Sequence, residues 1–416
     1  MNYFKRIQKR VNDYRESKYL SDDSLVADLQ KALELDRVLE NLDERKLYSK
    51  DESVFEGGIA GPVCFPITTS EVQTIMKIAE KHNRHVIPRG AGSGLAGGAI
   101  PLGAPIVIAM TKMNNVLEVD IENRIAWVEP GVINLELSDY LKPFGFHYAP
   151  DPSSQQICTL GGNVANNSGG PHCLADGVTD THVLALEVVL PSGEVTTFGG
   201  LDAEPTGLDL RGAFIGSEGT LGITTKIAVR LTPNPEDVQT LLISFPSMRK
   251  AAETVSAIIA DGIVPAAMEA MDQKTIEVIE KHIPSGYPTD AGAVLLVEVE
   301  GLVDGVEIEA LRIGEIAENY DASDIKIAQT SYQRDALWKG RKSAFGASTY
   351  LAPNYYLHDT VVPRSELADV LDKVNDLADK NNLTIMNVFH AGDGNLHPLL
   401  VFDASEEGTL ERVHQV

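Results

Sequence analysis

The stretch Pro88-Arg89-Gly90-Ala91-Gly92-Ser93-Gly94-Leu95-Ala96-Gly97-Gly98 decides how the rest of this chain is interpreted. Five of these residues are glycine. Glycine permits positive φ and lacks the Cβ that would keep a ligand away from the backbone. Successive N–H groups can therefore converge on an anion, and Arg89 adds a fixed positive charge at the edge of the loop. The stretch favours an anion-binding loop, with a flexible turn as the alternative.

Residues 92–97 of this stretch also match the dinucleotide-binding pattern G-x-G-x-x-G. That pattern binds a dinucleotide only between a strand and a helix. The following segment carries Pro101, Pro105 and then Ile106-Val107-Ile108, which indicates a strand instead. A nicotinamide-dependent dehydrogenase is therefore the less favoured alternative.

Length and composition limit the protein classes. A chain of 416 residues predicts two or three domains. The net charge of −25 argues against nucleic acid and against an anionic membrane surface. Cys64, Cys158 and Cys173 form no C-x-x-C pair, which fits a reducing compartment. No secretory signal and no long apolar segment is visible, so we expect a cytoplasmic protein with no integral membrane segment.

The first part of the chain predicts helices separated by short strands. Residues 1–50 are expected to be helical and amphipathic, with one apolar face. That face is formed by Leu25, Leu29, Leu33, Leu35 and Val38. Thr68-Thr69-Ser70-Glu71 is a capping box that opens a further helix. The expected buried positions of that helix are Val72, Ile75, Met76 and Ala79.

Two further stretches are rich in small residues and one is rich in prolines. Ala149-Pro150-Asp151-Pro152-Ser153-Ser154 precedes the segment 159–170, TLGGNVANNSGG, and residues 216–223 read GSEGTLGI. Loops this long are usually functional or disordered, and the interleaved apolar residues argue against disorder. Prolines and glycines with small polar side chains suit a large planar ligand that needs hydrogen bonds but no bulky neighbours. An ordinary polar loop is the alternative.

Thr232-Pro233-Asn234-Pro235-Glu236 has the composition of a linker. We therefore expect an N-terminal helical segment at 1–50, one domain at 51–235 and a second domain at 236–416. In the second domain, strands alternate with helices, which predicts an antiparallel sheet with helices on one face. One of the expected strands runs from Tyr356 to Val362.

The segment 390–398, HAGDGNLHP, holds two histidines at a glycine turn. His390 and His397 could converge on one cation, and imidazole suits zinc, iron or manganese. Either residue could instead be a structural histidine in the core.

The four segments PRGAGSGL, APDPSS, TLGGNVANNSGG and GSEGTLGI, in this order, resemble the FAD-binding (PCMH-type) domain of the vanillyl-alcohol oxidase type. Within that group the chain is similar to the family of the glycolate oxidase D subunit and D-lactate dehydrogenase. The resemblance implies an α+β protein. A two-part α/β FAD-binding domain would be followed by an antiparallel-sheet, ferredoxin-like substrate cap domain.

The resemblance also implies which residues contact FAD. Residues 89–95 would wrap the pyrophosphate through backbone N–H groups. Residues 130–131, 151–154 and 161–170 would line the cofactor, and residues 218–223 would meet its ribose and adenine end. The set is Pro88, Arg89, Gly90, Ala91, Gly92, Ser93, Gly94, Leu95, Pro130, Gly131, Asp151, Pro152, Ser153, Ser154, Gly161, Gly162, Asn163, Asn166, Ser168, Gly169, Gly170, Glu218, Gly219, Gly222 and Ile223. Covalent relatives carry a histidine in the first loop. Residues 90–93 hold none, so non-covalent FAD is expected, and His172 is a further candidate near the flavin ring.

For the second domain, the resemblance implies catalytic roles for Arg341, His390 and His397. The two histidines match the motif H-x-G-D-G-N-x-H and would hold a divalent ion (Zn, Mn or Fe) against the substrate's carboxylate and 2-hydroxyl. Arg341 would clamp the carboxylate. The implied reaction oxidises a small D-2-hydroxy acid, glycolate or D-lactate, to the 2-oxo acid, with hydride transfer from C2 to flavin N5. Electrons would pass to a quinone, an iron–sulfur partner or a second flavin subunit, and a homodimer is a further expectation.

Relatives continue for some tens of residues beyond the point that matches Val416 and carry a G-E-H-G motif. In that motif the glutamate completes the metal site and the histidine is the expected base. Glu406, Glu407 and His414 do not match it. Two explanations stay open, a truncated sequence and a shortened family member. The alternative function is accordingly an FAD-binding but catalytically impaired subunit that scaffolds a multi-subunit oxidase.

Overall fold

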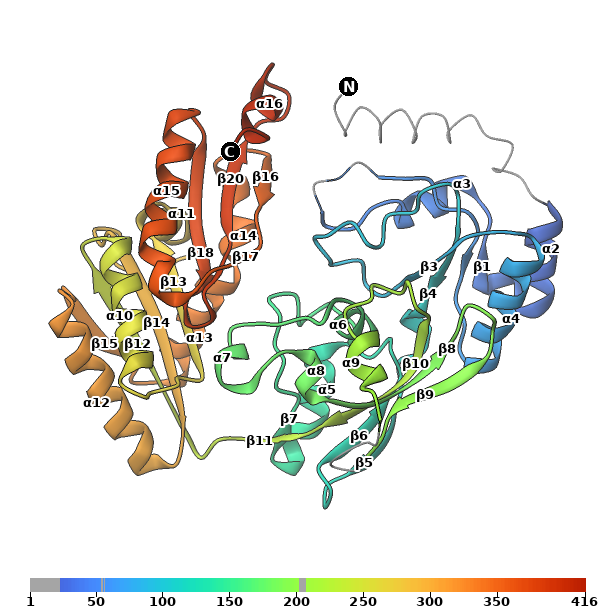
Figure 1. The fold of residues 1–416 in the computed structure, drawn as a ribbon, viewed down its shortest axis with the longest axis horizontal. Helices are drawn as coiled ribbons and strands as arrows, with labels where there is room; N and C mark the ends of the chain where they lie inside the picture. Colours follow the sequence, from blue (N-terminus) through green and yellow to red (C-terminus); the bar gives the residue numbers. More distant parts are fainter. Residues whose placement is uncertain (1–22, 54, 56, 202–206) are drawn as a thin grey trace. The chain divides into compact units, whose positions relative to one another are not determined.

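A computed structural model describes residues 23–53, 55, 57–201 and 207–416 (Figure 1). The chain divides into two compact units. The first consists of Met1–Gly169 and Val178–Asn234, and the second of Gly170–Gly177 and Pro235–Val416. Part of the expected N-terminal helical segment, residues 1–22, lies outside the described residues.

The N-terminal segment is helical over a shorter range than expected. Helix α2, Asp23–Ala32, buries Leu25 and Leu29. Leu35 is 71% exposed in the short helix η1, Leu35–Arg37, and Val38 belongs to strand β1, Val38–Leu39. The expectation of one continuous helical face is therefore wrong beyond Leu33, because Val38 pairs with Cys64 in the sheet.

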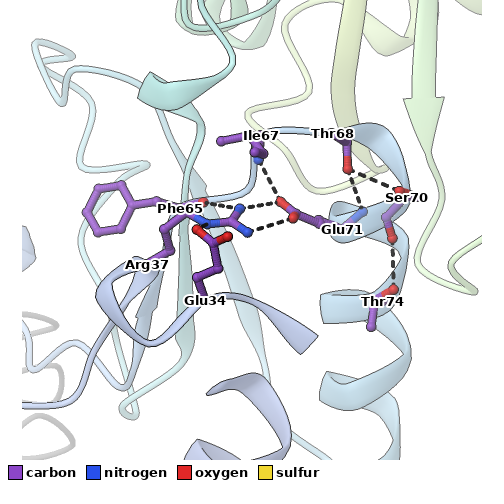
Figure 2. Close-up of polar contacts among 8 residues, drawn as sticks. All are labelled: Glu34, Arg37, Phe65, Ile67, Thr68, Ser70, Glu71 and Thr74. Atoms are coloured by element: carbon purple, nitrogen blue, oxygen red, sulfur yellow. Dashed lines mark hydrogen bonds and ion pairs between the residues drawn. The ribbon is translucent and has the colours of Figure 1, made fainter. Parts of the chain in front are cut away.

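Helix α4, Thr69–Lys81, begins at the capping residues that the sequence indicates. Thr68 Oγ1 accepts a hydrogen bond from Glu71 N–H at 3.2 Å (Figure 2). The Glu71 carboxylate accepts from Ile67 N–H at 2.8 Å and forms a bidentate pair with the buried Arg37. Figure 2 shows that this pair ties the end of η1 to the first turn of α4. Of the expected core positions of α4, Met76 is only partly buried.

The first sheet of unit 1 has the order β1-β2-β4-β3. Its other strands are β2, Val63–Cys64, β3, Val86–Arg89, and β4, Ile106–Ala109, and β4 is parallel to both β2 and β3. The glycine loop connects β3 to β4, and residues 90–105 contain no helix. The helix that a nicotinamide-binding G-x-G-x-x-G motif requires is thus missing.

The second sheet of unit 1 is antiparallel with the order β5-β6-β10-β8-β9. Its strands are β5, Val116–Asp120, β6, Ile125–Val128, β8, Val183–Val189, β9, Val195–Gly199, and β10, Ile223–Arg230. Helices α5, Asn134–Leu141, α6, Leu160–Asn166, and α9, Leu210–Phe214, contribute to its core. The remaining short elements are α3, Leu42–Arg45, α8, Thr179–His182, and the pair β7, Phe146–His147, with β11, Thr232–Pro233.

Unit 2 begins with a ferredoxin-like arrangement. The elements are β12, Asp237–Phe245, α10, Met248–Ala260, β13, Ala267–Asp272, β14, Ala293–Gly301, α12, Val303–Asn319, and β15, Asp324–Ile327. The strand order is β15-β12-β14-β13. Helix α11, Gln273–His282, is inserted between β13 and β14.

The sheet of unit 2 continues beyond β13 through strands from the end of the chain. These are β18, Thr384–His390, β19, Asn395–Leu396, and β17, Thr360–Val361, while β20, Pro398–Phe402, joins β18 to β16, Asn354–Leu357. The single strand expected over 356–362 is therefore wrong. The chain leaves one strand at Leu357 and enters the next at Thr360, and Asp359 lies in the break.

Helices cover both faces of this sheet, so the expectation of helices on one face is also wrong. Leu241 and Ile243 share a core with α10, α12 and α15, Leu367–Lys380. Leu242 shares a different core with α11, α13, Ser331–Lys342, and α14, Ala344–Ala347. Alternate strand residues point to opposite faces. The consecutive apolar residues of β12 and β14 are thus the signal for two covered faces.

The other short helices are α7, Cys173–Asp176, and α16, Thr409–Val413. Within the part of the chain that the structure describes, no helix has the length and apolar character needed to cross a membrane.

Candidate functional site

In unit 1 the glycine loop packs against two of the other predicted cofactor segments. A Cβ on Gly90 would overlap Thr159 Oγ1, and a Cβ on Gly98 would overlap the Glu218 carboxylate. A Cβ on Gly219 would overlap the ring of Pro88. Glycine is therefore required at these positions by close approach between loops, and segments far apart in the sequence form one surface.

The segment around residue 160 is helical, which corrects the expectation of an irregular loop. Thr159 caps α6 by accepting from Gly162 N–H at 3.3 Å. Gly161 N–H donates to Pro130 O at 2.8 Å, and a Cβ at Gly161 would lie 2.6 Å from Pro130 Cβ. Gly161 thus serves helix packing beside Pro130, and Gly162 takes part in the cap. Glu218 N–H in turn donates to Ala165 O at 2.9 Å, which ties the third small-residue stretch to α6.

The middle of the glycine loop leaves open space. Gly92 has a φ of +77°, a left-handed conformation that favours glycine. Among the described residues, no atom lies within 4 Å of a Cβ built at Gly94. Since no neighbouring protein atom explains the missing side chain at Gly94, the loop has room for a ligand against its backbone there.

Arg89 is buried at the edge of this loop. Its guanidinium carbon lies 5.7 Å from the ring centre of Tyr48, and its Nη1 donates to Ala99 O at 3.5 Å. Burial lowers the pKa of Arg89, while Asp51 and Tyr48 act to raise it. The charge lies directly beside the backbone of Gly92, where a Cβ would overlap the guanidinium. This position suits an anionic ligand held by the loop.

The other predicted cofactor residues lie in different surroundings. Asn163 is buried, and its amide contacts Asn134 at 3.1 Å and Cys158 at 3.4 Å. Asn166 donates to Gly162 O at 2.9 Å, within α6. Gly131 N–H donates to Met113 O, and Ser154 O accepts from Cys158 N–H. Gly169 ends one section of unit 1, whereas Gly170 begins the short section assigned to unit 2.

In unit 2 the three predicted catalytic residues come together around a carboxylate that sequence reasoning missed. Glu269 lies on β13, opposite His390 on β18. Its Oε1 is 2.7 Å from His390 Nδ1, and its Oε2 forms an ion pair with Arg341 Nη2. The His390 and His397 rings are 4.9 Å apart between centroids and nearly perpendicular. Glu269 and Arg341 are both 0% exposed.

Several buried polar atoms of this cluster lack hydrogen-bond partners. They include Nε, Nη1 and Nη2 of Arg341 and Nδ1 of His397. The ion pair between Arg341 Nη2 and Glu269 Oε2 is close, but its atoms are not aligned as a hydrogen bond. Unpaired buried polar atoms are costly. Their concentration at one place indicates a site for a polar ligand with acceptor atoms.

The electrostatics of the cluster depend on burial and on close charges. Burial acts to raise the pKa of Glu269, but Arg341 and His390 outweigh it and hold that pKa below its usual value. Burial lowers the pKa of His397, against the opposing effect of Asp359, whose Oδ1 is 3.5 Å from His397 Nε2. The neutral imidazole of His397 is the form that can bind a cation.

The two histidines fit a divalent cation in ligand chemistry. His390 shows the arrangement of many metal-binding histidines, with one ring nitrogen held by a carboxylate. His397 Nδ1 is a buried nitrogen without a partner. Over residues 23–53, 55, 57–201 and 207–416, however, no group of three or more His, Cys, Asp or Glu side chains is arranged to hold a metal.

Sequence reasoning missed Glu269 and Asp359. Glu269 had a visible signal, since it is a charged residue within an apolar strand. Asp359 gave no signal, because its place depends on the break between β16 and β17. His172 belongs to unit 2, where its Nε2 lies 3.3 Å from Oε1 of Glu298. The ring centroids of His172 and Trp338 are 5.6 Å apart.

Comparisons with known proteins match both parts of the chain to families of FAD-linked proteins. The family described as "FAD binding domain" matches residues 60–199, and "FAD linked oxidases, C-terminal domain" matches residues 234–416. The solved structure of 4-ethylphenol oxidase from Gulosibacter chungangensis has a TM-score of 0.79 at 17% identity, covering 96% of this chain and 87% of that one. A structure of alkyldihydroxyacetonephosphate synthase has a TM-score of 0.77 at 18% identity, covering 95% and 79%. The expected α+β fold of the vanillyl-alcohol oxidase type is confirmed.

Curated relatives are more similar in sequence. The chain is 42% identical to the glycolate oxidase subunit GlcD of Escherichia coli K12, over 85% of this chain and 71% of the relative. It is 42% identical to GlcD of Bacillus subtilis 168, over 90% of this chain and 81% of the relative. It is 32% identical to a D-lactate dehydrogenase of Anaerostipes hadrus, again over 90% of this chain and 81% of the relative. The chain therefore belongs to the family of FAD-linked oxidoreductases that includes GlcD and the D-lactate dehydrogenases.

Proposed function

We propose that this protein oxidises a small D-2-hydroxy acid, glycolate or D-lactate, to the corresponding 2-oxo acid with non-covalent FAD. The observation that carries the proposal is the buried guanidinium of Arg341, which has three nitrogens without hydrogen-bond partners beside two histidines. A carboxylate is the ligand that a guanidinium binds best. The names of the relatives supply the hydroxy acids, glycolate and lactate.

The residues of unit 1 would hold the cofactor. The backbone around Gly92 and Gly94 offers N–H groups and open space, and Arg89 adds a positive charge, which suits the pyrophosphate of FAD. Residues 90–93 contain no histidine for a covalent bond. When bound, FAD supplies the acceptor for the hydride that leaves C2 of the substrate.

The residues of unit 2 would hold the substrate. Arg341 would clamp its carboxylate with two N–H donors, which fixes the orientation of the C2–H bond. His390 and His397 would hold a zinc, manganese or iron ion, which lowers the pKa of a bound hydroxyl group. Both histidines are largely buried, so water is kept away from this part of the site.

The proposal extends to electron transfer and assembly. The GlcD relatives are named as subunits of an oxidase. We propose that this chain likewise works beside a partner, an iron–sulfur protein or a second flavin subunit, or passes electrons to a quinone. A homodimer and a cytoplasmic location, peripheral to the membrane through such a partner, belong to the same proposal.

An anaerobic spectroscopic experiment tests the proposed function. The purified protein is loaded with FAD, and glycolate and D-lactate are added separately, each with and without zinc or manganese. Bleaching of the flavin band by either acid supports the dehydrogenase and ranks the substrates. A flavin band that persists with both acids and both metals would favour the impaired, scaffolding subunit. Failure to bind FAD would refute the proposal for unit 1.

A further inference from the structure

We infer that Glu269 is a positioning residue whose single buried carboxylate fixes both His390 and Arg341. Its part in the reaction rests on the proposed function, but the geometry does not. Glu269 lies within β13, and its backbone is paired with that of His390 on β18. The two carboxylate oxygens of Glu269 contact different partners: Oε1 contacts the imidazole of His390, and Oε2 contacts the guanidinium of Arg341.

The contact with His390 determines which ring nitrogen carries the proton. A carboxylate oxygen accepts hydrogen bonds. His390 Nδ1, 2.7 Å from Glu269 Oε1, must therefore be the donor. In the neutral imidazole this leaves Nε2 with its lone pair, as the nitrogen able to bind a cation or accept a proton. Glu269 thus selects the tautomer of His390 and holds its ring orientation.

The contact with Arg341 balances a buried charge and occupies only one of the three guanidinium nitrogens. An unpaired guanidinium in the interior would be very costly. Glu269 supplies the opposite charge through its contact with Nη2, whereas Nε and Nη1 of Arg341 have no partner among the described residues. The guanidinium is therefore held in place while Nε and Nη1 remain available to a ligand carboxylate.

Glu298 provides a matched control within the same unit. It is a nearly buried glutamate on the neighbouring strand β14. It accepts hydrogen bonds from Trp338 Nε1 at 2.7 Å and from Thr240 Oγ1 at 2.5 Å. Its third contact is the ring of His172. Replacing Glu298 also disturbs a buried carboxylate, yet none of these contacts involves His390 or Arg341.

The test uses the full chain loaded with FAD and labelled with 15N-histidine. Side-chain NMR spectra report which nitrogen of each imidazole is protonated, and the variant His390→Asn assigns the signal of His390. We expect a protonated Nδ1 at His390 in the unsubstituted protein and in Glu269→Gln, whose amide oxygen can still accept. We expect that signature to be lost in Glu269→Leu and retained in Glu298→Gln. Should Glu269→Leu fail to fold because Arg341 is left unpaired, the double variant Glu269→Leu/Arg341→Leu removes both charges and gives the same readout.

Kinetics with the accepted hydroxy acid complete the test. Loss of a carboxylate that orients a histidine of this kind typically lowers activity about 10- to 100-fold. We expect kcat/KM to fall by this factor in Glu269→Leu, with FAD still bound, and to change little in Glu298→Gln. An unchanged His390 tautomer in Glu269→Leu, or equal losses of kcat/KM in the Glu269 and Glu298 variants, would overturn the inference. If neither hydroxy acid reduces the flavin of the unsubstituted protein, the proposed function fails, and the tautomer readout alone then decides the role of Glu269.

Discussion

Gly219 packs directly against the ring of Pro88, so the end of β3 and the stretch before β10 leave no room for a side chain between them. Gly219 also has a φ of +75°. In Gly219→Ala the methyl group would push the two loops apart, and overpacking of this kind costs about 1–3 kcal/mol. We expect FAD affinity to fall about 10- to 100-fold, measured by quenching of flavin fluorescence during titration.

Gly262 provides a control that distinguishes the effect of backbone strain from the effect of the clash with Pro88. Gly262 has a φ of +93°, but a Cβ there would meet no atom within 4 Å. Gly262→Ala therefore imposes a comparable strain without a clash and should leave FAD affinity unchanged. Equal effects of the two substitutions would contradict a specific role for the contact between Gly219 and Pro88.

At Gly94, in contrast to Gly219, a substitution is expected to affect the ligand and not the packing of the protein. No atom of the residues that the structure describes lies within 4 Å of a Cβ at this position, and the φ of Gly94 is not in the left-handed region. Gly94→Ala should therefore fold with a thermal midpoint close to that of the unsubstituted protein when both lack FAD. If the cofactor approaches the loop backbone there, the methyl group weakens FAD binding by about tenfold or more. Normal FAD affinity in this variant would place the cofactor elsewhere.

The FAD-binding domain could be predicted from the sequence because the glycine-rich segments that indicate it are local signals. The capping of α4 by Thr68 was predicted correctly for the same reason. It depends on residues within a few positions of each other. The signal against a nicotinamide site is equally local, because Pro101 and Pro105 stand between β3 and β4, where a helix would be needed.

What could not be predicted depends on pairing across long distances. The carboxylate of Glu269 reaches His390 only because β13 and β18 are neighbours in the sheet, although they are far apart in the sequence. Asp359 approaches His397 only because the chain breaks between β16 and β17. Helices on both faces were missed because consecutive apolar residues in β12 were not read as two buried faces.

Arg341 is predicted to act through the geometry of its guanidinium as well as its charge. Arg341→Lys keeps the charge but cannot form a bidentate bond with a carboxylate. Hydrogen bonds to charged groups contribute about 1.5–3 kcal/mol, so we expect kcat/KM to fall about 10- to 100-fold, mainly through KM. Arg334→Lys, a more exposed position on the same helix α13, should have no such effect. Unchanged kinetics in Arg341→Lys would remove this residue from the substrate site.

The bidentate pair between Arg37 and Glu71 should stabilise unit 1 in a pH-dependent way (Figure 2). Burial acts to raise the pKa of Glu71, but the hydrogen bonds from Arg37 and Ile67 lower it below the usual value of 4.5. A carboxylate with a lowered pKa contributes stability above its unfolded pKa and loses it as the pH falls through the folded value. Glu71→Gln should therefore lower the free energy of unfolding by about 1–3 kcal/mol near neutral pH, and the difference should vanish well below pH 4.5.

Urea unfolding of the two proteins at several pH values measures this difference. Asp43→Asn is the control, because Asp43 forms an exposed pair with Lys46. Exposed pairs contribute little to stability, so we expect Asp43→Asn to change the free energy of unfolding much less than Glu71→Gln does. A difference for Glu71→Gln that persists at the acidic end of the series would refute the assignment to the ion pair.

The three cysteines should differ sharply in reactivity toward a thiol reagent. Burial raises the pKa of Cys64 to about 12 and also raises that of Cys158. Cys173 is only partly buried. The thiolate is the reactive form, so near pH 8 to 9, close to the pKa of a free thiol, we expect one fast-reacting thiol per native chain and three after unfolding in urea. Cys173→Ser should abolish the fast reaction. A second native thiol that reacts at the same rate would mean that the core around Cys64 or the contact of Cys158 with Asn163 opens readily.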